Sequence, residues 1–301
     1  MTRPTIPRRL LLTGLPLAAV GVLTACGSSA AGSTDPSRPD GPAGGESGTS
    51  DGTGDGTGDV AITHIHRAIR DRDTILLATH QGLFQLGAAG QLTAVGPPID
   101  LMGFDIAADG TYLASGHPAP GSDLPQPVGL IRSTDRGRTW AQRSRGGQSD
   151  FHALTALGDG ALAFDDALRY SPDGVTWQVR QIPAPPRDLA AGPDGTVLAT
   201  TERGLLASDD RGLTWRTVPT PQLLVTVDWA GPGTVVGAST TGVLVVSRDA
   251  GVSWTVGPRS VGEVAAVTAS QPSAEQLEVL VVVGAQVLRT DDLGARTTAL
   301  L

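Results

Sequence analysis

Five histidines are the side chains of this chain best suited to chemistry near neutral pH, because imidazole ligates metals and exchanges protons in that range. His64 and His66 are two positions apart, and so are Asp150 and His152. Residues two apart in a β-strand point to the same side of it. Each pair should therefore present two polar groups together, and the strands that carry the pairs decide whether they meet.

The strands follow from a repeated octet, Ser133–Trp140, which reads Ser-Thr-Asp-Arg-Gly-Arg-Thr-Trp. Similar segments end at Trp177, Trp215 and Trp254, so the tryptophans are 37, 38 and 39 residues apart. This is the length of one four-stranded propeller blade. Short β-branched runs separated by Gly and Pro, without helical periodicity, predict an all-β fold. We expect a six-bladed β-propeller of four-stranded antiparallel sheets over residues 60–301. Seven blades is the alternative count, because the first and last blocks are weakly patterned.

The octet has the chemistry of a tight turn. A carboxylate accepts hydrogen bonds from backbone N–H groups, Gly supplies a positive φ, and Trp packs between sheets. The octet resembles the Asp-box, or BNR repeat, of sialidase-type propellers. That resemblance implies turns between the third and fourth strands of a blade, away from any active site. The aspartates to which it implies a structural role are Asp135, Asp173, Asp210, Asp249 and Asp292.

Aligning the blocks gathers the chemical side chains on one face of the predicted ring. One column at the channel mouth holds His66, Met102, His152 and Arg187, and the column two residues earlier holds His64, Asp100 and Asp150. The candidate metal ligands, all in blades one to three, are His64, His66, His80, Met102, His117, Asp150 and His152. Imidazole with thioether suits copper, and imidazole with carboxylate suits zinc or iron. The structural alternative is that each histidine only hydrogen-bonds a loop in a wide mouth.

The first sixty residues predict export and a tether. Arginines precede an apolar run that ends in Leu23-Thr-Ala-Cys26, which has the layout of a signal peptide over residues 1–25. Those four residues resemble a bacterial lipobox, which implies acylation of Cys26, the only cysteine of the chain. Residues 26–59 are rich in Gly, Ser, Thr and Asp and predict a solvated linker. We expect a lipoprotein whose partner is the outer face of the cell membrane.

The charge balance excludes a nucleic-acid partner. The chain carries 22 basic residues, all of them arginine, against 30 acidic ones, and its formal net charge is −8. A surface that follows phosphates needs the opposite balance.

The domain also resembles a family of exported bacterial propeller lipoproteins that are labelled glycosylhydrolase-like for their kinship to sialidases. The matching segments are His64–His66, Ala78–Phe84, Met102–Phe104, Leu113–Pro118, Gly129–Asp135 and Asp150–Leu154. The resemblance implies a propeller outside the membrane. The family label does not by itself establish an activity.

Two functions remain open at this point. The first is a tethered ligand-binding propeller, with copper or zinc on its histidine-rich face. The second is a glycoside hydrolase of the exo-sialidase type, for which the candidate catalytic residues are Asp150, Asp166, Glu202 and Arg187, with Arg67, Arg203 and Arg259 also near the predicted mouth. A sialidase needs a tyrosine nucleophile. However, Tyr112 and Tyr170 lie inside predicted strands, and the Phe/Tyr-Arg-Ile-Pro motif of sialidases is absent.

Overall fold

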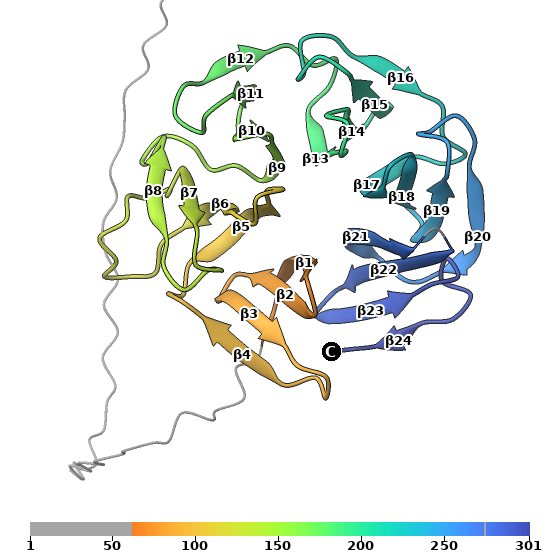
Figure 1. The fold of residues 1–301 in the computed structure, drawn as a ribbon, viewed down its shortest axis with the longest axis horizontal. Coiled ribbons are helices and arrows are strands. Elements are labelled where there is room, and N and C mark those ends of the chain that lie inside the picture. The colour runs from red at the N-terminus through yellow and green to blue at the C-terminus, as the bar shows by residue number, and fades with distance from the viewer. Residues whose placement is uncertain (1–61, 274) are drawn as a thin grey trace, which may run out of the picture. The chain divides into compact units, whose positions relative to one another are not determined.

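The computed structural model describes residues 62–273 and 275–301. Within them, six four-stranded antiparallel sheets surround a central channel as the blades of a propeller (Figure 1). The predicted fold class and the count of six blades are confirmed. No helix in these two ranges is long and apolar enough to cross a membrane. The predicted signal peptide (1–25), the acylated Cys26 and the linker (26–59) lie outside the described residues.

Each blade is formed by four consecutive strands, ordered from the channel to the rim. Blades 1 and 2 contain β1 (Ile65–Asp71), β2 (Thr74–Thr79), β3 (Gly82–Leu86), β4 (Leu92–Val95), β5 (Asp100–Ile106), β6 (Tyr112–His117), β7 (Leu130–Ser133) and β8 (Ala141–Ser144). Blades 3 and 4 contain β9 (Ala153–Leu157), β10 (Gly160–Phe164), β11 (Leu168–Ser171), β12 (Gln178–Arg180), β13 (Pro186–Ala191), β14 (Val197–Thr201), β15 (Gly204–Ser208) and β16 (Arg216–Val218). Blades 5 and 6 contain β17 (Leu224–Gly231), β18 (Thr234–Ser239), β19 (Val243–Ser247), β20 (Thr255–Ser260), β21 (Val264–Ser273), β22 (Gln276–Val283), β23 (Gln286–Thr290) and β24 (Thr298–Ala299).

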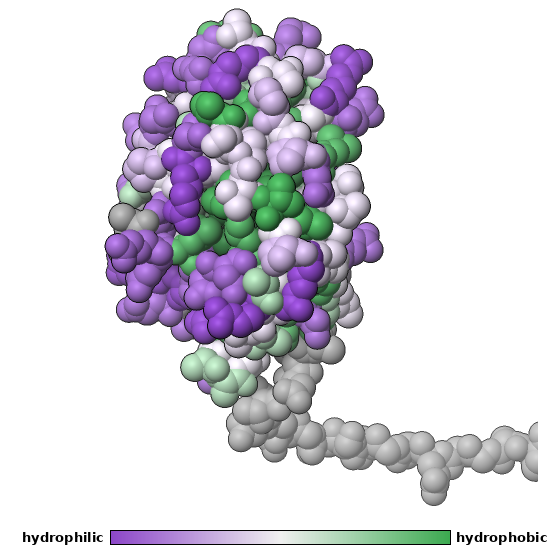
Figure 2. All heavy atoms as spheres, turned by 90° about the vertical axis from the view of Figure 1, so that its right-hand side faces the viewer, coloured by the Kyte–Doolittle hydropathy of each residue, from purple (hydrophilic) through white to green (hydrophobic). Residues whose placement is uncertain are grey.

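Burial separates the inner strands from the outer ones. The second and third strands are almost fully buried, as in β18 with its run of six buried residues. Their aliphatic side chains fill the spaces between neighbouring blades, where each hydrophobic cluster joins residues of two blades. The fourth strands are largely exposed. Figure 2 shows the outer edge of the ring, seen from the side on which β20 lies in Figure 1. On this edge, hydrophilic side chains surround a smaller hydrophobic area. Exposed Val252 and Val256 belong to this outer layer of blade 5.

The ring closes between blades 1 and 6 by side-chain packing, because every sheet uses only consecutive strands. Ile65 and Leu77 of blade 1 pack in one cluster with Leu280 and Val282 of blade 6. Arg70 on β1 also donates two hydrogen bonds to Glu278 on β22, at 2.6 and 2.9 Å. A bidentate charged pair of this kind fixes direction as well as distance.

The octet turns connect the third and fourth strands of their blades. In the turn of blade 4, the Asp210 carboxylate accepts hydrogen bonds from the Thr214 backbone N–H (2.8 Å) and the Thr214 hydroxyl (2.6 Å). The Ser208 hydroxyl lies 2.8 Å from the same carboxylate and accepts from Gly212 N–H. Arg211 and Gly212 both have positive φ. Glycine adopts this conformation without steric cost because it has no Cβ, which explains the glycine at the second position. These hydrogen bonds lower the pKa of Asp210 to about 2.

The turns at Asp135 and Asp249 repeat this pattern of bonds. The Asp173 turn is one residue shorter and keeps the bonds from Thr176 without a glycine N–H to the Ser171 hydroxyl, and in the Asp292 turn the Arg296 guanidinium takes the place of the hydroxyl donor. Each turn also packs on the preceding blade. A Cβ added to Gly251 of blade 5 would meet Val218 of blade 4, and one added to Gly294 would meet Val261 of blade 5. The turns therefore join blade to blade, which accounts for their regular spacing.

Candidate functional site

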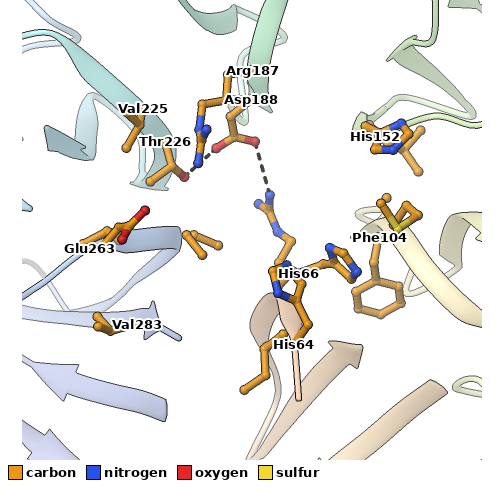
Figure 3. Close-up of a pocket in the computed structure, with 18 of the residues that line it drawn as sticks. His64, His66, Phe104, His152, Arg187, Asp188, Val225, Thr226, Glu263 and Val283 are labelled. Carbon is orange, nitrogen blue, oxygen red and sulfur yellow. Dashed lines mark hydrogen bonds and ion pairs between the residues drawn. The ribbon is translucent and has the colours of Figure 1, made fainter. Parts of the chain in front are cut away.

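A cavity of about 730 Å³ opens at one end of the channel (Figure 3). In five inner strands the pairing with the second strand skips one residue near the start, so that this residue bulges from the ladder. The skipped residues are His66, Met102, Arg187, Val225 and Ala265, and all five line the cavity. His152, just before β9, lines it from the remaining blade. The inner-strand bulges therefore aim one side chain per blade at the opening.

The walls of the cavity differ in character around the ring. Blades 1 to 4 contribute His66, Met102, His152 and Arg187, whereas blades 5 and 6 contribute Val225 and Ala265. Figure 3 shows His152 on the right side and Val283 with Glu263 on the left. The half formed by blades 1 to 4, here called the polar half, holds the histidines and arginines together with the apolar Met102, Phe104 and Leu154, whereas the half formed by blades 5 and 6 is mostly aliphatic.

Three imidazoles gather on blade 1. The rings of His64, His66 and His80 have centroids 4.6 to 5.0 Å apart. One nitrogen from each ring can be chosen so that the three atoms all lie within 4.8 Å of one another. His64 and His66 enter through β1, and His80 comes from the turn between β2 and β3. This proximity depends on the β1–β2 pairing, which sets Ile65 opposite Thr79.

Asp100 on the neighbouring blade 2 faces two of these rings. His80 Nδ1 lies 2.9 Å from Asp100 Oδ2, and because the carboxylate can only accept, this nitrogen carries the proton. His66 Nε2 lies 3.6 Å from Asp100 Oδ1, and both atoms are buried without a hydrogen-bond partner among the described residues. The His80 Nε2 lone pair is therefore free to bind a cation.

His66 is held in its neutral form. Burial, together with the neighbouring His64 and His80, lowers the pKa of His66 to about 4 against the smaller opposing effect of Asp100. A neutral imidazole is the form that ligates metals. At neutral pH the ring closest to the cavity therefore keeps its lone pair.

A second polar group lies on blades 2 and 3. Asp150 Oδ2 is 3.1 Å from His117 Nε2 and 3.6 Å from His152 Nε2. His117 is the last residue of β6, so it belongs to a strand and not to the loop that follows the strand. His117 does not line the cavity, whereas His152 does and is 61% exposed. The predicted ligands are thus divided between two groups, and no single cluster holds all of them.

The floor of the cavity is a buried charge network that the sequence alone did not reveal. Arg67 crosses the channel from blade 1, with its guanidinium 3.7 Å from Asp188 of blade 4 and 3.6 Å from Asp228 of blade 5. Burial raises the pKa of Asp228 to about 7, although Arg67 and the Ala269 N–H oppose this shift. The Asp188 carboxylate in turn accepts hydrogen bonds from Thr226 and Val227 of blade 5. These groups close the channel and join opposite blades.

The glycosidase candidates do not meet in the cavity. Asp150 lies against two histidines, Asp166 is in the turn between β10 and β11, and neither lines the opening. Glu202 lines a neighbouring groove that shares Arg187 with the cavity. Arg203 lines neither, and Arg259 donates to the Gly294 carbonyl, in the octet turn of blade 6.

Both tyrosines are packing residues. Tyr112 and Tyr170 are buried in the hydrophobic clusters between blades, and the Tyr112 hydroxyl donates to Asp71 at 2.6 Å. A tyrosine nucleophile of the sialidase type is therefore missing from the cavity.

Comparisons with solved structures support the propeller architecture. No known protein family matches the sequence, and no curated protein matches it closely enough to count as a relative. A virginiamycin B lyase from Staphylococcus aureus is similar in structure, with 14% identity, a TM-score of 0.54, and coverage of 79% of this chain and 84% of that one. A gluconolactonase from Xanthomonas campestris has 17% identity and a TM-score of 0.54, and covers 72% of this chain and 80% of that one. YCF48 in complex with a peptide has 15% identity and a TM-score of 0.51, over 79% of this chain and 81% of that one. Likeness at this level of identity shows the fold alone, a six-bladed β-propeller.

Proposed function

We propose that this propeller binds a transition-metal ion, with zinc as the best match, through His64, His66 and His80. The observation that carries the proposal is the set of three imidazole nitrogens within 4.8 Å, next to a carboxylate that already orients one ring. A carboxylate behind a ligating histidine is the usual outer contact of a zinc site. Asp100 has this role for His80, and its second oxygen faces His66.

The spacing of the three nitrogens fits a metal after a modest contraction. Zn–N bonds of about 2.1 Å in tetrahedral geometry place ligand atoms about 3.4 Å apart. His64 and His80 are exposed, and Asp100 already orients the His80 ring, so the approach needs side-chain motion only, chiefly of His64. Three protein ligands leave a fourth position open, as in zinc sites that bind a further ligand. That position would face the cavity, because His64 and His66 line it.

The choice of zinc over copper follows from the donor set. The cluster offers three nitrogens and a nearby carboxylate, which suit zinc, whereas a thioether such as that of Met102 among the ligands would favour copper(I). Met102 lines the cavity but belongs to the neighbouring blade and is not one of the clustered groups.

The proposal also includes the cellular location of the protein. The signal-like segment and Cys26 support export and attachment to the outer face of the membrane as an acylated lipoprotein. The octet turns support membership of the Asp-box propellers, since their carboxylates, hydroxyls and glycines form one recurrent hydrogen-bonded turn. Amino-terminal mass analysis of the membrane fraction tests the tether: a diacylglyceryl mass on Cys26, absent in Cys26→Ser, is expected. An unmodified Cys26 would refute it.

Metal analysis of the purified full-length protein tests the binding function. After loading with zinc and dialysis, we expect about one equivalent in the wild type, from one three-ligand site. His66→Ala and His80→Ala should lose it. His117→Ala is the matched control, because this histidine belongs to the separate group around Asp150 and should keep the zinc.

The proposal is refuted if the wild type retains no zinc, or if His117→Ala loses as much as His80→Ala. Retention of copper in place of zinc, with loss in Met102→Leu, would refute the donor set. Turnover of a fluorogenic sialoside that disappears in Arg187→Ala would instead support the glycoside hydrolase alternative.

A further inference from the structure

The cavity offers an unpaired cation on blade 4, across the channel from the histidine cluster of blade 1. Arg187, the bulged residue of β13, is exposed and makes no hydrogen bond or ion pair with any described residue. By contrast, Arg67 and Arg70, the other arginines of the inner strands, are both ion-paired. Guanidinium remains charged at all relevant pH values and matches the geometry of a carboxylate. An anionic group in the cavity would be the natural partner of Arg187.

The opposite wall favours hydrocarbon. Val225, Ala265 and Val283 line blades 5 and 6 of the cavity, and each is only partly buried, so their aliphatic surfaces face the opening. No polar side chain other than Glu263 at the rim and Thr226 near the floor lies on this wall among the described residues. Thr226 already donates to Asp188. A ligand that extends from the polar half to this wall would bury apolar surface there, which is favourable.

Glu263 sets a limit on the charge of such a ligand. Its carboxylate lies at the rim of the aliphatic wall, on the far side of the opening from His152 (Figure 3). A second negative charge at the far end of the ligand would approach Glu263 and be repelled. One anionic end and one neutral apolar end fit the cavity best.

We propose that the cavity binds an aliphatic monocarboxylate. Its carboxylate would pair with Arg187 of blade 4, and its chain would lie against Val225, Ala265 and Val283 of the neighbouring blades 5 and 6. This inference goes beyond the proposed zinc site, which lies on blade 1, across the channel from Arg187. The cavity volume of about 730 Å³ is ample for a chain of several carbons and lies within the usual range for small-molecule sites.

Calorimetric titration of the zinc-loaded full-length protein tests the proposal, with hexanoate, acetate, hexylamine and adipate as probes. Hexanoate should bind more tightly than acetate by about fourfold for each methylene buried. Hexylamine lacks the anion and adipate adds a second one, so both should bind at least about tenfold more weakly.

Two arginine variants separate a specific contact from general charge. Arg187→Gln should weaken hexanoate binding about tenfold or more, because it removes a charge-assisted hydrogen bond. Arg203→Gln is the matched control: it lies in the same blade, outside the cavity, and should bind hexanoate as the wild type does. Both variants should keep the zinc, which shows that they are folded.

The outcomes distinguish this inference from the zinc site itself. If zinc is retained but hexanoate binds no better than acetate or hexylamine, or equally well to Arg187→Gln, the carboxylate proposal is wrong and the zinc site stands. If no zinc is retained, the proposed function fails. Hexanoate binding that disappears when zinc is removed would overturn the pairing with Arg187 as the source of the anion's affinity.

Discussion

Replacing Arg67 with methionine should destabilise the propeller more than the replacement of any other single arginine, whether on the surface or in the channel. The Arg67 side chain is only 11% exposed, and its guanidinium lies between Asp188 and Asp228, which belong to blades 4 and 5. Methionine fills similar space without the charge. The variant leaves two buried carboxylates without their cation, and breaking a buried charge pair in this way costs about 3–5 kcal/mol. For a domain of this size, that corresponds to a fall of roughly 10 °C in the unfolding temperature.

The loss should depend on pH in a defined direction. The pKa of Asp228 in the folded protein is raised to about 7, above the value of about 3.9 in an unfolded chain. A group raised in this way favours the folded state at low pH, and that contribution is lost as pH rises from about 4 through 7. Without Arg67 the pKa of Asp228 rises further, since Arg67 is the main charge that lowers it. The difference in stability between wild type and Arg67→Met should therefore be larger at about pH 8 than at about pH 5.

Thermal unfolding followed by circular dichroism at the two pH values measures this difference. Arg67→Met/Asp228→Asn should recover part of the lost stability at the higher pH, because the uncompensated charge is gone. Arg203→Met, at an exposed turn position, is the control and should unfold like the wild type. If Arg67→Met unfolds within about 2 °C of the wild type at both pH values, the channel network does not join the blades as described.

Three further predictions follow from single contacts. Asp100→Asn should weaken zinc binding about 10- to 100-fold in a competition titration without unfolding the protein, because the neighbouring carboxylate orients His80. In acid titrations of stability, the unfolding free energy of Asp210→Asn should change less between about pH 4 and pH 2 than that of the wild type. The lowered pKa of Asp210 stabilises the fold above that range, and the effect is lost as pH falls through it. A double-mutant cycle of Arg70→Gln and Glu278→Gln should give a coupling of about 1 kcal/mol in urea unfolding, because the pair closes the ring but remains partly exposed.

The repeated octets were enough to predict the architecture. Tryptophans at intervals of 37 to 39 residues, together with Gly and Pro between short β-branched runs, determine both the blade length and the order of strands. Each block of this length contains four short strands in the structure, such as β3 (Gly82–Leu86) in blade 1 and β5 (Asp100–Ile106) in blade 2. The reason is that each blade is a local unit of consecutive strands, so no long-range pairing had to be guessed.

Placement of the histidines was predictable, but their division into groups was not. The blade alignment put His66, Met102, His152 and Arg187 in one column, and all four line the cavity. It could not show that Asp100 on one blade would face the histidines of the next, while Asp150 would turn to His117 and His152. Such contacts depend on rotamers across a blade interface, on which sequence spacing carries no information.

The channel network was missed for a different reason, although it left a signal. Asp105, Asp188 and Asp228 each stand inside an inner strand at a position where a buried aliphatic residue would be the default. A charged residue in a buried strand indicates a partner. The partner of Asp188 and Asp228, however, is Arg67, which lies three and four blades earlier in the chain. From its sequence position next to His66, Arg67 is predicted to lie at the mouth of the channel. The structure turns it the other way, since successive residues of a strand alternate in direction.

The inner-strand bulges explain how one scaffold keeps its ring and still varies its chemistry. Each bulged residue leaves the ladder, so its side chain carries little of the packing between blades, whereas the residues that follow it build the channel network and the cores. Because Val225 and Ala265 occupy the same place as His66 and Arg187, exchanging them should alter ligand binding without altering the fold. Val225→His is the sharpest case: its imidazole would join the cavity from the aliphatic side. The unfolding temperature should stay within about 2 °C of the wild type while hexanoate affinity falls, and a large loss of stability would show that the bulged positions hold the ring together after all.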